Sequence, residues 1–122
     1  MAILATASAP EGEAVFRRWN QMGQAHYQRL GVESHAVPVR VRPDADERSH
    51  VEAVRSASMV FFSGGDPGHL RRTLLGSDLL RAIVEMVSRG GVYGGCSAGA
   101  MVVGEPLEDG AGITARALGH GL

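Results

Sequence analysis

The fold is decided by the stretch Gly90-Gly91-Val92-Tyr93-Gly94-Gly95-Cys96-Ser97-Ala98-Gly99-Ala100-Met101-Val102-Val103-Gly104. It joins a short apolar run to a serine flanked by glycines, and then to small residues that suit the start of a helix. Its centre, from Gly95 to Gly99, fits the pattern G-x-S-x-G. In that pattern a serine occupies a tight turn between a strand and a helix, with its hydroxyl exposed at the carboxyl end of a sheet. The stretch therefore predicts Ser97 as a nucleophile.

Glycine is needed around such a turn for steric reasons. The strained backbone brings strand and helix together, so the residues two before and two after the serine must lack side chains. Gly95 and Gly99 meet this requirement. A helix starting near Ala98 would aim its unpaired N–H groups and its positive dipole end at the serine, which favours an oxyanion there. Because 17 of the 122 residues are glycine, the pattern alone is also compatible with a purely structural turn.

The composition of the chain limits its size and its partners. With 122 residues, the chain is predicted to form one domain over residues 1–122. A net charge of −1 without a basic run argues against nucleic acid and membrane surfaces, and favours a small molecule or peptide. The single cysteine excludes an internal disulfide, and no stretch resembles a signal peptide or a membrane span. We therefore expect a cytoplasmic protein.

Strands and helices are predicted to alternate along the chain, which indicates an α/β fold with a parallel sheet covered on both faces. Apolar runs predict strands at residues 3–5, 37–41, 59–62 and 92–94, although Pro38 lacks a backbone donor and indicates a sheet edge or a strand end. Helices are expected at residues 11–30, 47–57, 69–75 and 78–88. The loops after Ala5, Phe62 and Gly95 should meet at one edge of the sheet, where such folds place their sites.

The first predicted helix carries a periodic apolar pattern. Spacings of three and four residues relate five of its side chains, Val15, Trp19, Met22, His26 and Leu30. Such spacing is typical of one apolar stripe along a helix. We expect this stripe to face the core.

Three blocks of the sequence resemble the cyanophycinase and peptidase E (α-aspartyl dipeptidase) family of serine peptidases. Residues 3–8 are similar to the family's first P-T-A-S strand and loop, residues 61–66 to its F-x-G-G-D loop, and residues 94–104 to its G-G-x-S-A-G-A-x-x-x-G turn. The resemblance implies a three-layer α/β/α fold of the class I glutamine amidotransferase-like, flavodoxin-like type. It also implies hydrolysis of peptide or isopeptide bonds in aspartyl-type substrates through an acyl-enzyme.

The resemblance further assigns roles to individual residues. Ser97 matches the nucleophile. The backbone N–H of Ala98, together with that of Gly64 or Gly65, matches the family's oxyanion hole. Asp66 matches the acidic residue that closes the second loop, next to the substrate. The next position is usually glutamine in cyanophycinases, near the substrate, and is Pro67 here. Pro67 has no side-chain donor, so we expect the substrate preference to differ from theirs.

A serine nucleophile also needs a base. The family's histidine follows the serine by several tens of residues, in a strand with no counterpart here, so we expect the chain to be a fragment or a truncated form of the domain. Of the histidines present, His26 and His35 are expected to pack, and His50 to lie on a solvated helix. His69 remains a candidate base because it starts the helix after the second loop. His120, and the acidic residues Glu105, Glu108 and Asp109, are expected in loops, although one acid could orient a base.

Cys96 offers an alternative, because amidotransferases of this fold use a cysteine at the turn. It precedes the central position, so we expect its side chain to point into the packing. No spacing of histidines and carboxylates suggests a metal site, and no cofactor is expected. A domain that binds a ligand or partner without catalysis is the alternative function. An incomplete domain would also expose sheet edge and core surface, which favours a homodimer.

Overall fold

The computed structural model describes residues 1–103 of the chain. These residues form a parallel sheet with the strand order β2-β1-β3-β4. The strands are β1 (Ala2–Leu4), β2 (His35–Ala36), β3 (Met59–Phe62) and β4 (Val92–Gly95). The helices are α1 (Glu13–Arg29), α2 (Arg48–Arg55), α3 (Pro67–Leu74), α4 (Asp78–Ser88) and α5 (Ala98–Met101), with short 3-10 helices η1 (Thr6–Glu11) and η2 (Arg42–Asp46).

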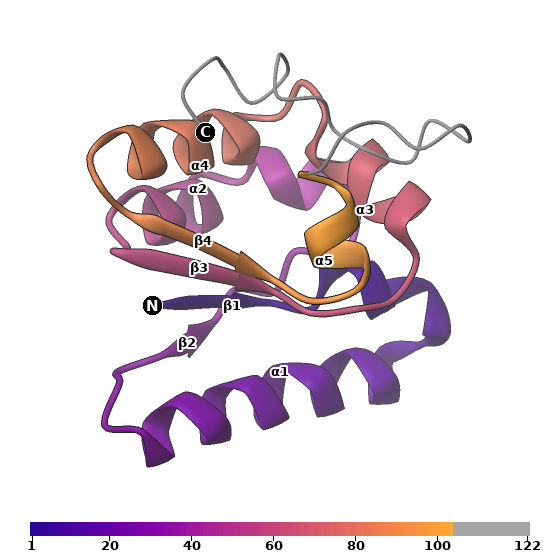
Figure 1. Ribbon diagram of the computed structural model, residues 1–122. Coiled ribbons are helices and arrows are strands. Elements are labelled where there is room, and N and C mark those ends of the chain that lie inside the picture. The colour runs from indigo at the N-terminus through magenta and orange to yellow at the C-terminus, as the bar shows by residue number, and fades with distance from the viewer. Residues whose placement is uncertain (104–122) are drawn as a thin grey trace.

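Helices cover both faces of the sheet (Figure 1). α1 lies along one face and contacts β1 and β2. α2 and α4 pack against each other on the opposite face, and α3 contacts both η1 and α5. The predicted three-layer α/β/α architecture is therefore confirmed. Within residues 1–103, none of the helices has the length and apolar character needed to cross a bilayer.

The register of the sheet aligns the carboxyl ends of three strands. Leu4 pairs with Phe62, and Phe62 pairs with Gly95. The pairing continues into the loops, because the N–H of Ser63 donates to the carbonyl of Leu4 at 3.1 Å and the N–H of Cys96 donates to that of Phe62 at 3.2 Å. The three loops therefore meet at one edge of the sheet, as predicted.

The main core lies between the sheet and the layer of α2 and α4. Large side chains that are almost fully buried there come from both sides: Leu4, Phe62, Val54, Leu79, Ile83 and Met86. α4 begins as the sequence predicts, because the side chain of Ser77 accepts a hydrogen bond from the N–H of Leu80 at 3.0 Å. This layer anchors β3 and β4, the two strands that lead into the site.

The second strand is not where the apolar run of residues 37–41 predicts it. β2 covers only His35–Ala36, and the ladder ends with the N–H of Val37, which donates to the carbonyl of Ile3 at 2.9 Å. The next donor facing β1 would be the N–H of Val39, but it donates to the carbonyl of Val37 at 2.8 Å, so the ladder ends there. Val37 and Val39 are nevertheless 3% and 0% exposed. The apolar run thus reflects burial rather than strand pairing.

The predicted core-facing stripe of α1 is also wrong. Its members lie beside the buried face, and three of them are strongly exposed: Trp19 at 40%, Met22 at 48% and Leu30 at 64%. The side chains that face the sheet belong to Phe16 and Asn20, which are 1% and 6% exposed. One turn further, a Cβ at Gly23 would lie 2.8 Å from Cγ2 of Ile3. A glycine and an asparagine therefore occupy the contact face, and hydrophobicity alone does not reveal it.

Candidate active site

Ser97 occupies the turn between β4 and α5. Its φ is 51° and its ψ is −116°, and within residues 1–103 it is the only residue other than glycine with a positive φ. A residue other than glycine in so sparsely populated a backbone conformation costs about 1–3 kcal/mol, so the surrounding structure must hold it there. The carbonyl of Ser97 accepts hydrogen bonds from the N–H groups of Ala100 at 3.0 Å and Met101 at 2.8 Å. Those bonds place the exposed serine at the start of α5.

The glycines on either side of Ser97 permit very close backbone packing. A Cβ at Gly95 would lie 2.6 Å from the carbonyl carbon of Gly99. A Cβ at Gly99 would lie 2.2 Å from the carbonyl oxygen of Phe62. Both neighbours are backbone atoms, so rotation of a side chain cannot relieve either contact. The geometry agrees with the steric requirement expected for a strand-turn-helix serine.

Tyr93 fastens α5 to the end of the sheet. Its hydroxyl donates to the carbonyl of Gly99 at 2.6 Å, and its ring stacks on Phe62 with centroids 5.4 Å apart. Burial raises the pKa of Tyr93, so the hydroxyl remains protonated and available as a donor. No motif in the sequence assigns this role to Tyr93. The available signal is a single aromatic residue in a short glycine-containing strand, two positions before Gly95.

The second glycine loop lies directly beside Ser97. A Cβ at Gly64 would lie 3.2 Å from Cβ of Ser97 and 3.6 Å from its Oγ. Gly65 has a φ of 148°, and a Cβ there would lie 2.2 Å from the carbonyl oxygen of Ala7. The loop is therefore held between the first loop and the serine. In the part of the chain that the structure describes, the N–H groups of Gly64, Gly65 and Ala98 donate to no protein atom.

Asp66 and Pro67 have clear structural roles in this loop. Oδ1 of Asp66 accepts a hydrogen bond from the N–H of His69 at 3.1 Å and so caps α3. The N–H of Asp66 donates to the carbonyl of Ala7 at 2.7 Å. Pro67 is the first residue of α3, where its fixed φ and missing N–H are tolerated. Contact of either residue with a substrate stays a prediction.

His69 is held away from the role of a base. Its Nε2 donates to the carbonyl of Arg40 at 2.7 Å. Within residues 1–103, no histidine shares a hydrogen bond with Ser97. Four other candidates, His120, Glu105, Glu108 and Asp109, lie outside the described residues.

The remaining histidines differ from their predicted environments. His26 is exposed rather than packed, and the side chain of His35 is 69% exposed beside Glu33. His50, expected in solvent, has a side chain only 12% exposed, with Nδ1 2.9 Å from the carbonyl oxygen of Asp44. All three predictions are wrong. His26 is exposed because the apolar stripe of α1 does not face the sheet, and His35 because β2 is an edge strand. His50 is covered because η2 packs on α2.

Cys96 is exposed, so the prediction that it packs internally is wrong. Its side chain lines a hollow on the face of the sheet that carries α1. α1 packs mainly on β1 and β2 and leaves this end of β4 uncovered. Cys96 does not share the left-handed backbone of Ser97, which keeps Ser97 as the residue at the centre of the turn.

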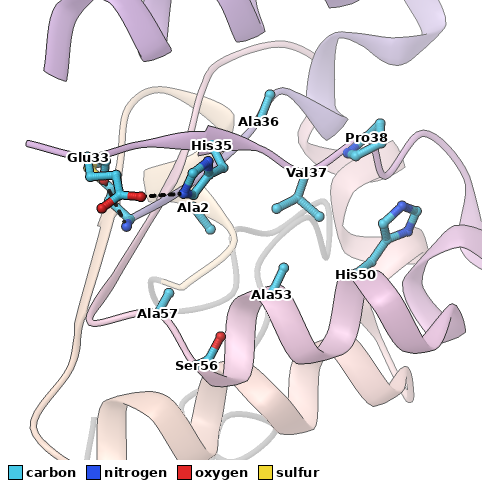
Figure 2. A pocket seen from close by; sticks show the side chains of 11 residues that line it. Ala2, Glu33, His35, Ala36, Val37, Pro38, His50, Ala53, Ser56 and Ala57 are labelled. Atoms are coloured by element: carbon cyan, nitrogen blue, oxygen red, sulfur yellow. Dashed lines mark hydrogen bonds and ion pairs between the residues drawn. The ribbon is translucent and has the colours of Figure 1, made fainter. Parts of the chain in front are cut away.

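A second hollow, of about 420 Å³, lies at the opposite edge of the sheet (Figure 2). It is bordered by the amino end of β1, by β2 with the two residues that follow it, and by α2. Its lining includes Ala2, Val37, Ala53, His35 and His50. In Figure 2 a dashed line joins Nε2 of His35 to Oε1 of Glu33, which are 3.3 Å apart. Sites in parallel α/β sheets form at the carboxyl edge instead. Across residues 1–103, no group of three potential metal ligands is present here or elsewhere.

The fold and site define an α/β protein of three layers with a strained, exposed serine at the carboxyl edge of a parallel sheet. The sequence profile of peptidase family S51 matches residues 10–112, and the chain belongs to this family. The resemblance carried by the three sequence blocks is thereby confirmed. No curated protein sequence gives a significant match.

Two crystal structures show the same fold. One is a peptidase from an acI-B1 Actinobacterium, with 43% sequence identity, a TM-score of 0.81, and coverage of 84% of this chain and 42% of that one. The other is a putative peptidase E protein from Listeria monocytogenes EGD-e, with 20% identity, a TM-score of 0.62, and coverage of 83% and 47%. The chain therefore spans less than half the length of either protein.

Proposed function

We propose that the protein containing this chain is a serine peptidase in which Ser97 forms an acyl-enzyme with aspartyl-type peptide or isopeptide substrates. The observation that carries the proposal is the left-handed backbone of Ser97, held at an exposed turn in contact range of Gly64. Membership in peptidase family S51 supports the reaction class. Similarity to the actinobacterial peptidase supports it further.

The proposed reaction proceeds in two steps. Oγ of Ser97 attacks the substrate carbonyl carbon as a base takes its proton, and the carbonyl oxygen becomes an oxyanion. The C–N bond then breaks, and the leaving amine takes up the proton. Water next hydrolyses the ester on Ser97, which releases the acid and restores the hydroxyl. The N–H groups of Ala98 and of Gly64 or Gly65 are the proposed oxyanion donors, each worth roughly 3 kcal/mol in the transition state.

We place the general base outside residues 1–103. The hydrogen bond from His69 to the Arg40 carbonyl occupies the ring nitrogen Nε2, and His35 and His50 border the other hollow. The exposed His26 lies on α1, where its ring contacts Tyr27 edge-on. The same observation favours the second candidate function for the isolated chain. If residues 104–122 supply no base either, the chain by itself would bind a ligand or partner rather than hydrolyse it.

The remaining features of the proposal concern partners and location. We propose an aspartyl peptide as substrate, no cofactor, and no contact with nucleic acid or membranes, in a cytoplasmic protein. A homodimer is supported by β4, an edge strand among the described residues, whose Val92 is 54% exposed. Light scattering on the purified protein tests the assembly directly.

A hydrolysis assay tests the proposed function. The protein containing this chain should cleave Asp-X or β-aspartyl dipeptides, and Ser97→Ala should lower kcat/KM by three or more orders of magnitude, as expected for loss of a nucleophile (roughly 10³-fold or more). Cys96→Ala, one position away, is the matched control and should retain activity. Turnover that survives Ser97→Ala would contradict the proposal, and selective binding without any turnover would favour the non-catalytic function.

A further inference from the structure

His69 ties the start of α3 to the segment that follows β2. Its Nε2 donates a hydrogen bond to the carbonyl oxygen of Arg40 at 2.7 Å, although the two residues lie 29 positions apart in the sequence. Its own N–H donates to Oδ1 of Asp66 at 3.1 Å, and its carbonyl accepts a hydrogen bond from the hydroxyl of Thr73 at 2.9 Å. One residue thus connects Asp66, which closes the second glycine loop, to a part of the chain outside α3.

Arg40 is a firm point of attachment because three neighbours hold it. Its N–H donates to Oδ2 of Asp44 at 2.9 Å, and its Nε and Nη2 donate to the two carboxylate oxygens of Glu13 at 2.8 and 2.6 Å. Its guanidinium also lies 4.5 Å from the centre of the ring of Phe16, which is buried. A two-point bond between guanidinium and carboxylate fixes orientation as well as distance. The residue whose carbonyl accepts the bond from His69 is therefore fastened to both α1 and η2.

The other end of this connection is the glycine loop beside Ser97. The N–H of Asp66 donates to the carbonyl of Ala7 at 2.7 Å, and Asp66 directly follows Gly65. Gly64 is in contact range of Ser97, since a Cβ there would lie 3.2 Å from that of the serine. α3 also contacts α5, the helix that begins after Ser97. A displacement of the first turn of α3 would therefore move the glycine loop relative to the serine.

We propose that His69 is a positioning residue, whose bond to the Arg40 carbonyl holds the N–H groups of Gly64 and Gly65 in place beside Ser97. The inference rests on the proposed function, in which one of these N–H groups stabilises the oxyanion. His69 acts as a hydrogen-bond donor and takes no proton from Ser97. Oxyanion donors act on the transition state more than on bound substrate, so loss of this bond should lower kcat and leave KM almost unchanged.

Three substitutions of His69, made in the protein containing this chain, separate hydrogen-bond donation from size and basicity. His69→Gln keeps a donor near the position of Nε2 but has no basic nitrogen, so it should retain the wild-type kcat. His69→Met has a similar length without a donor, and His69→Asn has a donor that is too short to reach Arg40. Both should lower kcat, and the rate at which a serine-reactive phosphonate labels Ser97, by about tenfold or more. A glutamine variant as slow as the methionine variant would overturn the inference.

Gln24→Met is the matched control for a lost tether. Nε2 of Gln24 donates to the carbonyl of Ser34 at 3.2 Å, so it ties α1 to the residue before β2, at the amino edge of the sheet. This variant removes the same kind of bond, from a side-chain N–H to a backbone carbonyl, far from the glycine loop. Its labelling at Ser97 should be normal. Labelling as slow as in His69→Met would overturn the inference, because the effect would then follow stability alone.

Amide hydrogen exchange reads the position of the loop without any turnover. The N–H of Asp66, which donates to Ala7, should exchange about tenfold faster in His69→Met and His69→Asn and at the wild-type rate in His69→Gln. Normal exchange in His69→Met, with turnover that depends on Ser97, would leave the peptidase proposal intact and overturn the inference. Faster exchange that glutamine restores, in a protein whose turnover survives Ser97→Ala, would support the tether and refute the proposed function.

Discussion

Gly99→Ala tests whether close packing of α5 on β3 is what holds Ser97 in place. The new Cβ would lie 2.2 Å from the carbonyl oxygen of Phe62, 2.8 Å from its carbonyl carbon and 2.9 Å from its Cβ, where ordinary contacts begin at 3.4 Å. No side-chain rotation removes the first two contacts. The start of α5 must therefore move outward by about 1 Å, a displacement large enough to disturb catalytic geometry.

Gly99→Ala should lower the free energy of unfolding because it overpacks this contact. Inserting a methyl group into a tightly packed site typically costs about 1–3 kcal/mol of unfolding free energy. For a domain of this size, a loss of about 2 kcal/mol lowers the Tm by roughly 10 °C, which a thermal unfolding scan resolves. Moving α5 also strains the bond from Tyr93 to the Gly99 carbonyl. The rate of phosphonate labelling at Ser97 should fall by about 100-fold.

Gly68→Ala is the matched control for the same chemical change. Gly68 lies in α3 outside the left-handed region. Its added Cβ would lie 3.1 Å from the flexible guanidinium of Arg72 and 3.3 Å from Oδ1 of Asp66, so both neighbours are side-chain ends that can shift slightly. This variant should be neutral, or stabilised by up to about 1 kcal/mol through helix propensity, with normal labelling. A Gly99→Ala protein as stable and as reactive as Gly68→Ala would refute the packing argument.

Three further substitutions test individual contacts. Tyr93→Phe removes the hydroxyl that bonds the Gly99 carbonyl and should lower the unfolding free energy by about 1 kcal/mol in urea titrations, with slower labelling of Ser97; unchanged stability and labelling would show that the bond is unimportant. Asp66→Ala removes the cap of α3 and should cost about 1 kcal/mol, whereas Asp66→Asn should retain most of it; equal losses in both would argue against capping. Cys96→Ala should change stability by less than about 0.5 kcal/mol, and the folded wild-type thiol should react with a thiol reagent, since Cys96 is exposed; a protected thiol would contradict its placement.

Strands and helices buried on the main core were predictable from the sequence. The bounds of β3 and α4 agree with prediction, because β3 is a dense apolar run and α4 is an amphipathic segment capped by Ser77. The meeting of the three loops at one sheet edge followed from the parallel topology. The neighbourhood of Gly64 and Ser97 was predictable for the same reason.

Features that depend on how elements pack were not predictable. The contact face of α1 contains Asn20 and Gly23, which an apolar periodicity cannot select, so the exposed stripe with Trp19 was assigned to the core. Cys96 is exposed because α1 packs on β1 and β2, an arrangement that no local pattern encodes. The hydrogen bond of Tyr93 likewise depends on the position of α5 relative to the sheet.

The most direct test of the central claim is labelling with a serine-reactive phosphonate followed by mass mapping of the adduct. The protein containing this chain should carry the adduct on Ser97, since that residue combines the left-handed turn with the neighbouring glycine loop. The label should disappear in Ser97→Ala and persist in Cys96→Ala. An adduct on Cys96, or an active protein that remains unlabelled at Ser97, would contradict the serine mechanism.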